Sequence, residues 1–312
     1  MRCAVLDDLQ GAAAHLADWS TLSGVEVTFF GDHVSDASVL TDFDIIVTLR
    51  ERVRFPAGVL ERLPRLKLLV ATGMRNSAID LAAAARLGVT VCGTEATATP
   101  TVELTWALLL GLARSVVEEN TALRAGGKWQ STLGADLHGR TLGVAGLGRI
   151  GGPVAGVGLA FGMRVRAWSR NLTAERAAER GATLAGSLDE LLATSDFVTI
   201  HLPLADGTRG LIGARELGLM KPDAYLINTS RAAIVDQDAL LGALHAGRIA
   251  GAGIDVFDLE PLPAGHPMRT APRLLATPHL GYVSRANYET YYRHAVEDIA
   301  AFIAGAPIRL LD

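Results

Sequence analysis

The segment 141–151 constrains the fold more than any other part of this chain of 312 residues. It reads TLGVAGLGRIG, an apolar run followed by a G-x-G-x-x-G pattern and a helical stretch. After a strand, the first glycine permits a tight turn, the second lets the backbone approach a pyrophosphate, and the third lets the helix pack closely. The start of the helix adds unpaired N–H groups for the phosphates. We therefore predict a dinucleotide-binding loop formed by Gly146, Gly148, Arg149, Ile150 and Gly151.

Short apolar runs alternate with helical patterns along the whole chain. The expected strands are 3–6, 25–30, 44–49, 66–71, 89–92, 141–145, 164–168, 197–202, 224–228, 253–257 and 274–277. Strands rich in Val, Ile and Leu that alternate with helices are typical of parallel sheets covered on both faces. The predicted fold class is α/β, with two doubly wound parallel-sheet domains and a cleft between them. One is a Rossmann cofactor domain and the other a flavodoxin-like substrate domain.

The chain is expected to cross twice between these domains. Residues 1–98 and 284–312 would form the substrate domain, and residues 99–283 the dinucleotide-binding domain. Helices are expected at 12–19, 59–63, 79–87 and 285–303, and a capping box at 187–190 opens another. One long helix is predicted from about 101 to 123, because Pro100 precedes it and Gly126-Gly127 follows. Trp129, in the loop after it, would either anchor a contact between two chains or be buried within one.

Composition excludes several classes of protein. The 29 Lys+Arg and 33 Asp+Glu residues give a net charge of −4, whereas nucleic-acid-binding proteins carry a clustered basic excess. Cys3 and Cys92 lie in apolar runs and are expected to be buried, free thiols in a reducing compartment. No signal peptide is evident, and the apolar stretch 104–113 falls short of the ~20 residues that span a bilayer. We expect a cytoplasmic protein with no metal site, because no ligand cluster has suitable spacing.

The end of the second strand of the cofactor domain indicates which dinucleotide is used. NAD sites usually place a carboxylate there to bind the ribose 2′-OH. In this chain the strand 164–168 ends in Ser169-Arg170-Asn171, without a carboxylate. A guanidinium matches a 2′-phosphate with two hydrogen bonds. The sequence therefore favours NADP(H), with NAD(H) still possible.

Three polar residues follow the ends of three other predicted strands. Arg231 follows 224–228, Glu260 follows 253–257, and His279 follows 274–277. Ligands of open α/β sheets bind beyond the carboxyl ends of the strands. A cation, a carboxylate and an imidazole at that edge suit hydride transfer to a 2-oxo acid, and we predict these three as the catalytic residues.

With these motifs the sequence resembles the D-isomer-specific 2-hydroxyacid dehydrogenase family over nearly its whole length. Within the family it is most similar to the glyoxylate/hydroxypyruvate reductase-like, NADP-type branch. The motifs that carry the resemblance are GLGRIG at 146–151, HLPLADGTRGLI at 201–212, INTSRAAIVD at 227–236, GIDVFDLEPLP at 253–263, TPHLGYVS at 277–284 and ATGMRNSAID at 71–80.

The resemblance implies a role for each site residue. Arg231 would clamp the substrate carboxylate, His279 would exchange a proton with the substrate oxygen, and Glu260 would hold the imidazole and favour its charged form. Asp255 would bind the nicotinamide carboxamide. The remaining cofactor contacts implied are His201, Pro203 and Thr208 at the adenosine end, and Thr229, Ser230, Arg231, His279 and Gly281 at the nicotinamide end. Backbone N–H groups of Met74, Arg75 and Asn76 would meet the substrate carboxylate from the other domain.

Some positions stay open. Ala205 and Ala232 stand where the family often has Thr and Gly, and both are small enough to be tolerated. Arg50 and Arg75 would either contact an acidic group of the substrate or face solvent, and His266 is a loop residue without an assigned role.

The favoured function is reduction of a small 2-oxo acid, such as glyoxylate or hydroxypyruvate, to the D-2-hydroxy acid, with a homodimer implied by the resemblance. The alternatives are a corepressor-like protein that senses dinucleotides and a formate- or phosphite-type dehydrogenase. Glu260 counts against the formate branch, which lacks the glutamate partner.

Overall fold

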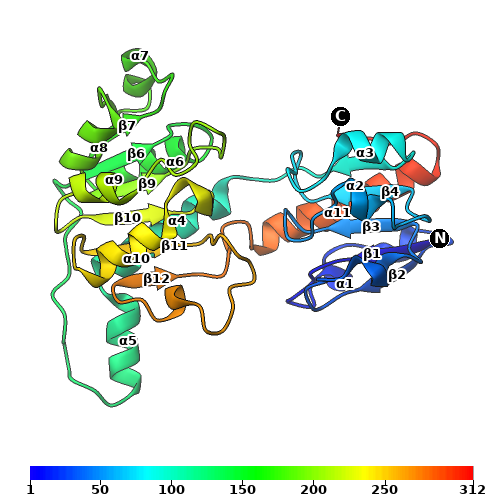
Figure 1. Ribbon diagram of the computed structural model, residues 1–312, viewed down its shortest axis with the longest axis horizontal. Coiled ribbons are helices and arrows are strands. Elements are labelled where there is room, and N and C mark those ends of the chain that lie inside the picture. Colours follow the sequence, from blue (N-terminus) through cyan, green and yellow to red (C-terminus); the bar gives the residue numbers. More distant parts are fainter. Residues whose placement is uncertain (312) are drawn as a thin grey trace. The chain divides into compact units, whose positions relative to one another are not determined.

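A computed structural model describes residues 1–311, and Figure 1 shows its ribbon. The chain folds into two compact units. Unit 1 contains Met1–Thr97 and residues 284–311, and unit 2 is Ala98–Val283. Each unit is a parallel sheet with its own helices, so the predicted α/β class with two parallel-sheet domains is confirmed.

Unit 1 is built on a sheet of five parallel strands in the order β2-β1-β3-β4-β5, which is the flavodoxin-like order. The strands are β1 (Arg2–Val5), β2 (Glu26–Phe29), β3 (Ile45–Thr48), β4 (Leu68–Ala71) and β5 (Thr90–Gly93). The helical segments are α1 (Ala13–Leu16), η1 (Trp19–Thr21), η2 (Ala37–Leu40), α2 (Ala57–Leu60), α3 (Leu81–Arg86) and α11 (Arg285–Ile303). Every residue of β3 and β4 is buried, as expected for central strands with helices on both faces.

The C-terminal segment belongs to unit 1. The Ser284 hydroxyl caps α11 by accepting a hydrogen bond from the Asn287 N–H at 3.3 Å. After the helix the chain returns to β5, where Leu310 pairs with Cys92 in an antiparallel bridge. Cys92 and Cys3 are buried free thiols, as predicted, and burial raises the pKa of each to about 12. Neither thiol is therefore a ready nucleophile near neutral pH.

Unit 2 contains a sheet of seven parallel strands in the order β12-β11-β10-β9-β6-β7-β8. The strands are β6 (Thr141–Ala145), β7 (Arg164–Trp168), β8 (Thr183–Leu184), β9 (Phe197–Ile200), β10 (Tyr225–Asn228), β11 (Gly251–Ile254) and β12 (Leu274–Ala276). Counted from β6, the first six strands follow the 3-2-1-4-5-6 order of dinucleotide-binding folds. The short strand β8 is absent from the sequence prediction, because two residues give no readable alternation.

Helices cover the sheet of unit 2. They are α4 (Thr99–Ala113), α5 (Val116–Arg124), α6 (Gly151–Ala160), α7 (Ala174–Ala178), α8 (Leu188–Thr194), α9 (Ala214–Leu219) and α10 (Gln237–His245), with 3-10 turns η3 (Ala232–Ile234) and η4 (Pro267–Arg269). The Ser187 hydroxyl caps α8, accepting from the Glu190 N–H at 3.0 Å, as the predicted capping box requires.

The prediction of one long helix from about 101 to 123 is wrong in one respect. It is broken at Ser115, whose φ of 48° is left-handed, and α4 and α5 meet at 64°. The reason is burial: α4 packs on β10 and β11 with seven residues buried, whereas α5 buries none. Figure 1 shows α5 extending away from the sheet of its unit. Within residues 1–311, no single helix is long and apolar enough to cross a membrane; only this bent pair meets those criteria together.

Candidate active site

Every predicted site residue of unit 2 follows the carboxyl end of β6, β7, β9, β10, β11 or β12 at one edge of the sheet, on a loop or, for Gly151, at the start of α6. The strands are parallel and in register, with Ile200, Asn228 and Ile254 side by side at the ends of β9, β10 and β11. The order of strands reverses between β6 and β9, so this edge contains the topological switch point at which ligands of such folds bind.

The loop after β6 has the shape of a phosphate cradle. Gly146 has a φ of +100°, and a methyl group on it would lie 2.7 Å from the His201 carbonyl oxygen. A methyl group on Gly151, the first residue of α6, would lie 1.9 Å from the Gly146 oxygen. In contrast, a methyl group on Gly148 would meet no other atom within 4 Å. The first and third glycines are therefore required by the fold, and the second leaves space for a bound pyrophosphate, with Arg149 and Ile150 leading into α6.

Ser169, Arg170 and Asn171 directly follow β7, as the sequence predicts. The Arg170 guanidinium lies against Gly207 of the loop after β9, because a methyl group on Gly207 would be 2.5 Å from its Nη2. Arg170 is exposed, so its charge is available to a ligand between these two loops. This is the end of the sheet where dinucleotide folds hold the adenosine ribose.

The loop after β9 carries His201, Pro203 and Thr208. Thr208 closes the loop: its hydroxyl donates to the Pro203 carbonyl oxygen at 2.7 Å and accepts from the Ala205 N–H at 2.8 Å. The His201 Nε2 lies 2.9 Å from the Thr199 hydroxyl. Burial lowers the pKa of His201 to about 3, so this imidazole is neutral at any pH near 7.

His279 and Glu260 form a hydrogen-bonded pair. The His279 Nδ1 lies 2.6 Å from the Glu260 Oε2, and the other carboxylate oxygen of Glu260 accepts from the Phe257 N–H at 2.9 Å. Both side chains are about one quarter exposed or less. The Tyr282 ring meets the imidazole edge-on, with the centroids 5.3 Å apart. The carboxylate fixes the orientation of the ring, and Nε2 is left as the nitrogen that can exchange a proton with a ligand.

Asp255 organises the turn that carries His279. One of its oxygens accepts from the Thr277 hydroxyl and the Leu280 N–H, both at 2.7 Å, and the other accepts from the Gly281 N–H at 2.8 Å. The side chain is fully buried, and burial raises the pKa of Asp255. The resemblance assigns Asp255 to the cofactor, whereas in this structure its contacts are with the active-site turn.

The turn after β10 presents Arg231. The buried Asn228 accepts from the Ser230 N–H at 3.0 Å and donates to the Arg231 carbonyl oxygen at 3.1 Å. The Ser230 hydroxyl donates to the Leu202 carbonyl oxygen at 2.6 Å, which ties this turn to the loop after β9. Asn228 and Ser230 thus hold the backbone of a half-buried arginine two strands away from His279 in the sheet.

Sequence reasoning missed a set of hydroxyls on α4. The Thr105 hydroxyl lies 2.8 Å from that of Thr229 and from the Thr101 carbonyl oxygen, and the Thr101 hydroxyl donates to the Gly281 carbonyl oxygen at 2.6 Å. Thr101 and Thr105 are four residues apart on the predicted helix and so share one face. That spacing was the available signal, but it does not say which loops the face meets.

In unit 1, Met74, Arg75 and Asn76 follow β4. Met74 and Arg75 are exposed, whereas Asn76 is buried and donates to the Arg50 carbonyl oxygen at 2.7 Å. Arg50, after β3, has a left-handed φ of 51°, and its guanidinium donates to the Thr72 carbonyl oxygen at 3.1 Å. The Arg50 side chain therefore helps to hold this loop, and the Arg75 side chain is more accessible to a ligand.

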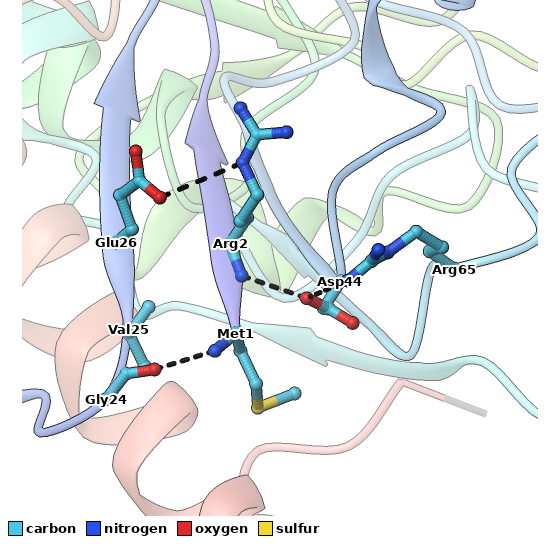
Figure 2. Close-up of a pocket in the computed structure, with 7 residues that line it drawn as sticks. All are labelled: Met1, Arg2, Gly24, Val25, Glu26, Asp44 and Arg65. Atoms are coloured by element: carbon cyan, nitrogen blue, oxygen red, sulfur yellow. Dashed lines mark hydrogen bonds and ion pairs between the residues drawn. The ribbon is translucent and has the colours of Figure 1, made fainter.

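Other features lie apart from this constellation. His266 caps η4 by accepting from the Met268 N–H at 3.2 Å, which gives it a structural role. A pocket of about 440 Å³ in unit 1 lies at the opposite, amino-terminal edge of its sheet (Figure 2). Its charges pair with one another, including Arg2 with Glu26 and Arg65 with Asp44, so it offers no catalytic arrangement. Across residues 1–311, no group of three His, Cys, Asp or Glu side chains could hold a metal ion.

Comparison with known proteins agrees with this architecture. Residues 106–281 match the family model described as D-isomer specific 2-hydroxyacid dehydrogenase, NAD binding domain. A glyoxylate reductase of Aeropyrum pernix is 42% identical over 261 residues, which cover 81% of this chain and 78% of that protein. A D-3-phosphoglycerate dehydrogenase of Synechocystis is 34% identical over 274 residues, covering 87% of this chain and 49% of that protein.

A solved structure extends the similarity to the whole chain. The phosphoglycerate oxidoreductase of Vibrio cholerae superposes with a TM-score of 0.93 at 38% identity, covering 98% of this chain and 100% of that one. The chain therefore belongs to the D-isomer-specific 2-hydroxyacid dehydrogenase family and is an oxidoreductase with the nicotinamide-dinucleotide-binding domain of that family.

Proposed function

We propose that this protein reduces a small 2-oxo acid to the D-2-hydroxy acid with NADPH. The observation that carries the proposal is the pair of His279 and Glu260, 2.6 Å apart at the same sheet edge as the phosphate cradle. An oriented imidazole beside a dinucleotide site is what proton-coupled hydride transfer requires. Relatives named as reductases and dehydrogenases favour such an enzyme over a dinucleotide-sensing binding protein.

Unit 2 would hold the dinucleotide. The pyrophosphate would lie at Gly148 and the start of α6. The adenosine ribose would lie between Arg170 and the loop of His201, Pro203 and Thr208. Thr229, Ser230 and Gly281 would line the nicotinamide end. The contacts with the substrate carboxylate that the resemblance implies for Met74, Arg75 and Asn76 stay a prediction.

Each catalytic residue then has one task. A reduced nicotinamide, when bound, supplies the hydride that reaches C2 of the oxo acid. The Arg231 guanidinium binds the substrate carboxylate with two hydrogen bonds and fixes the orientation of C2. His279 donates the proton on Nε2 to the C2 oxygen as negative charge develops there, and Glu260 stabilises the imidazolium before that transfer. In the oxidative direction the same Nε2 accepts the proton.

Glyoxylate and hydroxypyruvate are the substrates that the proposal puts first, because a glyoxylate reductase is 42% identical to this chain. A phosphorylated 2-oxo acid is the second candidate, since phosphoglycerate dehydrogenases are also similar and Arg75 is an exposed cation on the loop after β4. The engagement of Glu260 with His279 counts against a formate-type reaction, in which no proton has to be delivered to a substrate oxygen.

The cofactor assignment predicts a clear kinetic result. With glyoxylate, hydroxypyruvate and a phosphorylated 2-oxo acid as substrates, we expect a higher kcat/KM with NADPH than with NADH. Arg170→Ala should weaken NADPH binding by about 10- to 150-fold, the value of losing a charge-assisted contact worth about 1.5–3 kcal/mol, and leave NADH binding unchanged. Fluorescence titration with each dinucleotide measures both constants.

A second test of the same contact is Gly207→Ala, because the three atoms nearest to its new methyl group all belong to the Arg170 guanidinium, which would have to move. Gly207→Ala should weaken NADPH binding when Arg170 is present, and it should have no further effect in the Arg170→Ala background. A preference for NADH of about tenfold or more in the unmodified protein would overturn the NADPH assignment.

We further propose that two copies associate through α5 and the loop that follows it. Trp129 is 74% exposed and Leu133 is 100% exposed, so the alternative that Trp129 is buried within one chain is wrong. Three apolar side chains of α5 are also more than half exposed, namely Val116, Val117 and Leu123. Contiguous exposed apolar side chains of this kind mark surfaces that bind another protein chain. Sedimentation velocity should give a dimer that Trp129→Ala weakens. A wild-type protein that sediments as a monomer at micromolar concentration would refute this assembly.

A further inference from the structure

The turn that carries His279 adopts a backbone conformation that needs support from outside the turn. His279 has a φ of 55°, in the left-handed region that a residue with a Cβ rarely occupies. A residue held in this region is strained, and this conformation persists only where the surrounding structure imposes it. Directly after β11, Asp255 supplies one support by accepting hydrogen bonds from Thr277, Leu280 and Gly281.

The second support comes from α4. The Thr101 hydroxyl donates to the Gly281 carbonyl oxygen at 2.6 Å, whereas Asp255 accepts from the N–H of the same residue. A methyl group on Gly281 would lie 3.1 Å from the Asp255 Oδ2 and 3.5 Å from the Thr101 side chain. Gly281 is thus enclosed between these two side chains. The Thr105 hydroxyl donates to the Thr101 carbonyl oxygen and lies 2.8 Å from the Thr229 hydroxyl, so the same face of α4 also contacts the turn after β10.

We propose that Thr101 is a positioning residue for the proton transfer: its hydroxyl, together with Asp255, fixes the turn that sets where the His279 imidazole stands. This inference rests on the proposed role of His279. A displacement of about 1 Å far from the reacting atoms can lower a rate by about 100-fold, because the reaction needs the donor in line with its acceptor. Removing one of the two supports should displace the imidazole by less than about 1 Å, because the other support still holds the turn.

The test is the variant Thr101→Val, which replaces the hydroxyl with a methyl group. We expect kcat for 2-oxo acid reduction to fall by about tenfold. The KM of the oxo acid should stay at the wild-type value, since Arg231 is untouched. The Kd of NADPH should change by less than kcat does, since the phosphate cradle is untouched and only the contact to Gly281 at the nicotinamide end is loosened. Thr101→Ser, which keeps the hydroxyl, should restore kcat. If the valine variant does not fold, Thr101→Ala removes the same hydrogen bond without adding a methyl group.

The matched control is Thr194→Val. Thr194 is also half-buried, and its hydroxyl also donates to a backbone carbonyl oxygen, that of Glu190 at 2.7 Å, but on α8 away from the turn. This variant should lose stability without losing kcat. The proposal is overturned if folded Thr101→Val keeps the kcat of Thr194→Val, or if Thr101→Ser is as slow as Thr101→Val. Failure of the proposed function would be seen in a different variant, because His279→Ala would then keep full activity.

Discussion

Replacing His279 with alanine should lower kcat for 2-oxo acid reduction by about 10²- to 10⁴-fold, the usual contribution of a general acid. The Glu260 carboxylate 2.6 Å from Nδ1 orients the ring and stabilises its protonated form, so Glu260→Gln should also slow the reaction, though by less. Dinucleotide binding should survive both changes, because neither side chain belongs to the phosphate cradle. Steady-state kinetics together with NADPH titration measures the two effects.

His279 would serve both directions of the reaction. Reduction needs a proton on its Nε2 and oxidation needs the same nitrogen to accept one, so His279→Ala should slow both. His245→Ala is the matched control, because His245 is exposed on α10 and its Nδ1 lies 2.8 Å from the Leu241 carbonyl oxygen of the same helix. Near-full kcat in His279→Ala would refute general acid catalysis by this residue.

Replacing Arg231 with alanine should lower kcat/KM for the oxo acid by about 10²- to 10⁴-fold, because two charge-assisted hydrogen bonds worth about 1.5–3 kcal/mol each are lost. Arg231→Lys keeps the charge but cannot bind a carboxylate through a planar fork, so it should recover only part of the loss. The effect should appear in the KM of the oxo acid as well as in kcat, unlike that of His279→Ala. Initial-rate kinetics with glyoxylate separates the two parameters.

The control for this arginine is Arg215→Ala. Arg215 pairs with Asp189 at 2.8 Å on the surface, where its side chain is 62% exposed, and such pairs contribute little to stability. Its removal should leave kcat/KM unchanged. If Arg231→Ala bound and reduced glyoxylate as well as the control, the substrate carboxylate would have to be held by other groups, and the proposed orientation of C2 would fail.

Much of the fold was predictable because the signals were local. The cradle at 146–151 could be found because turn chemistry and the change from strand to helix lie within one short segment. The strands β6 and β7 have the predicted bounds, and α11 begins and ends where the periodic pattern does. The break at Ser115 was not predictable, because helical propensity continues through it and only the lack of a sheet to pack on ends the buried helix.

The class of fold, the dinucleotide-binding loop and the family could be predicted from the amino-acid sequence, because each depends on residue types at fixed short spacings. Which side chains meet is set by three-dimensional packing. This packing places His279 next to Glu260, 19 positions away in the sequence, and Thr101 next to Gly281, 180 positions away. It also directs the Asp255 side chain towards the turn that carries His279. The order of strands and the packing of α4 set these contacts, and neither can be read from a local pattern, because both arise from burial shared across the whole unit.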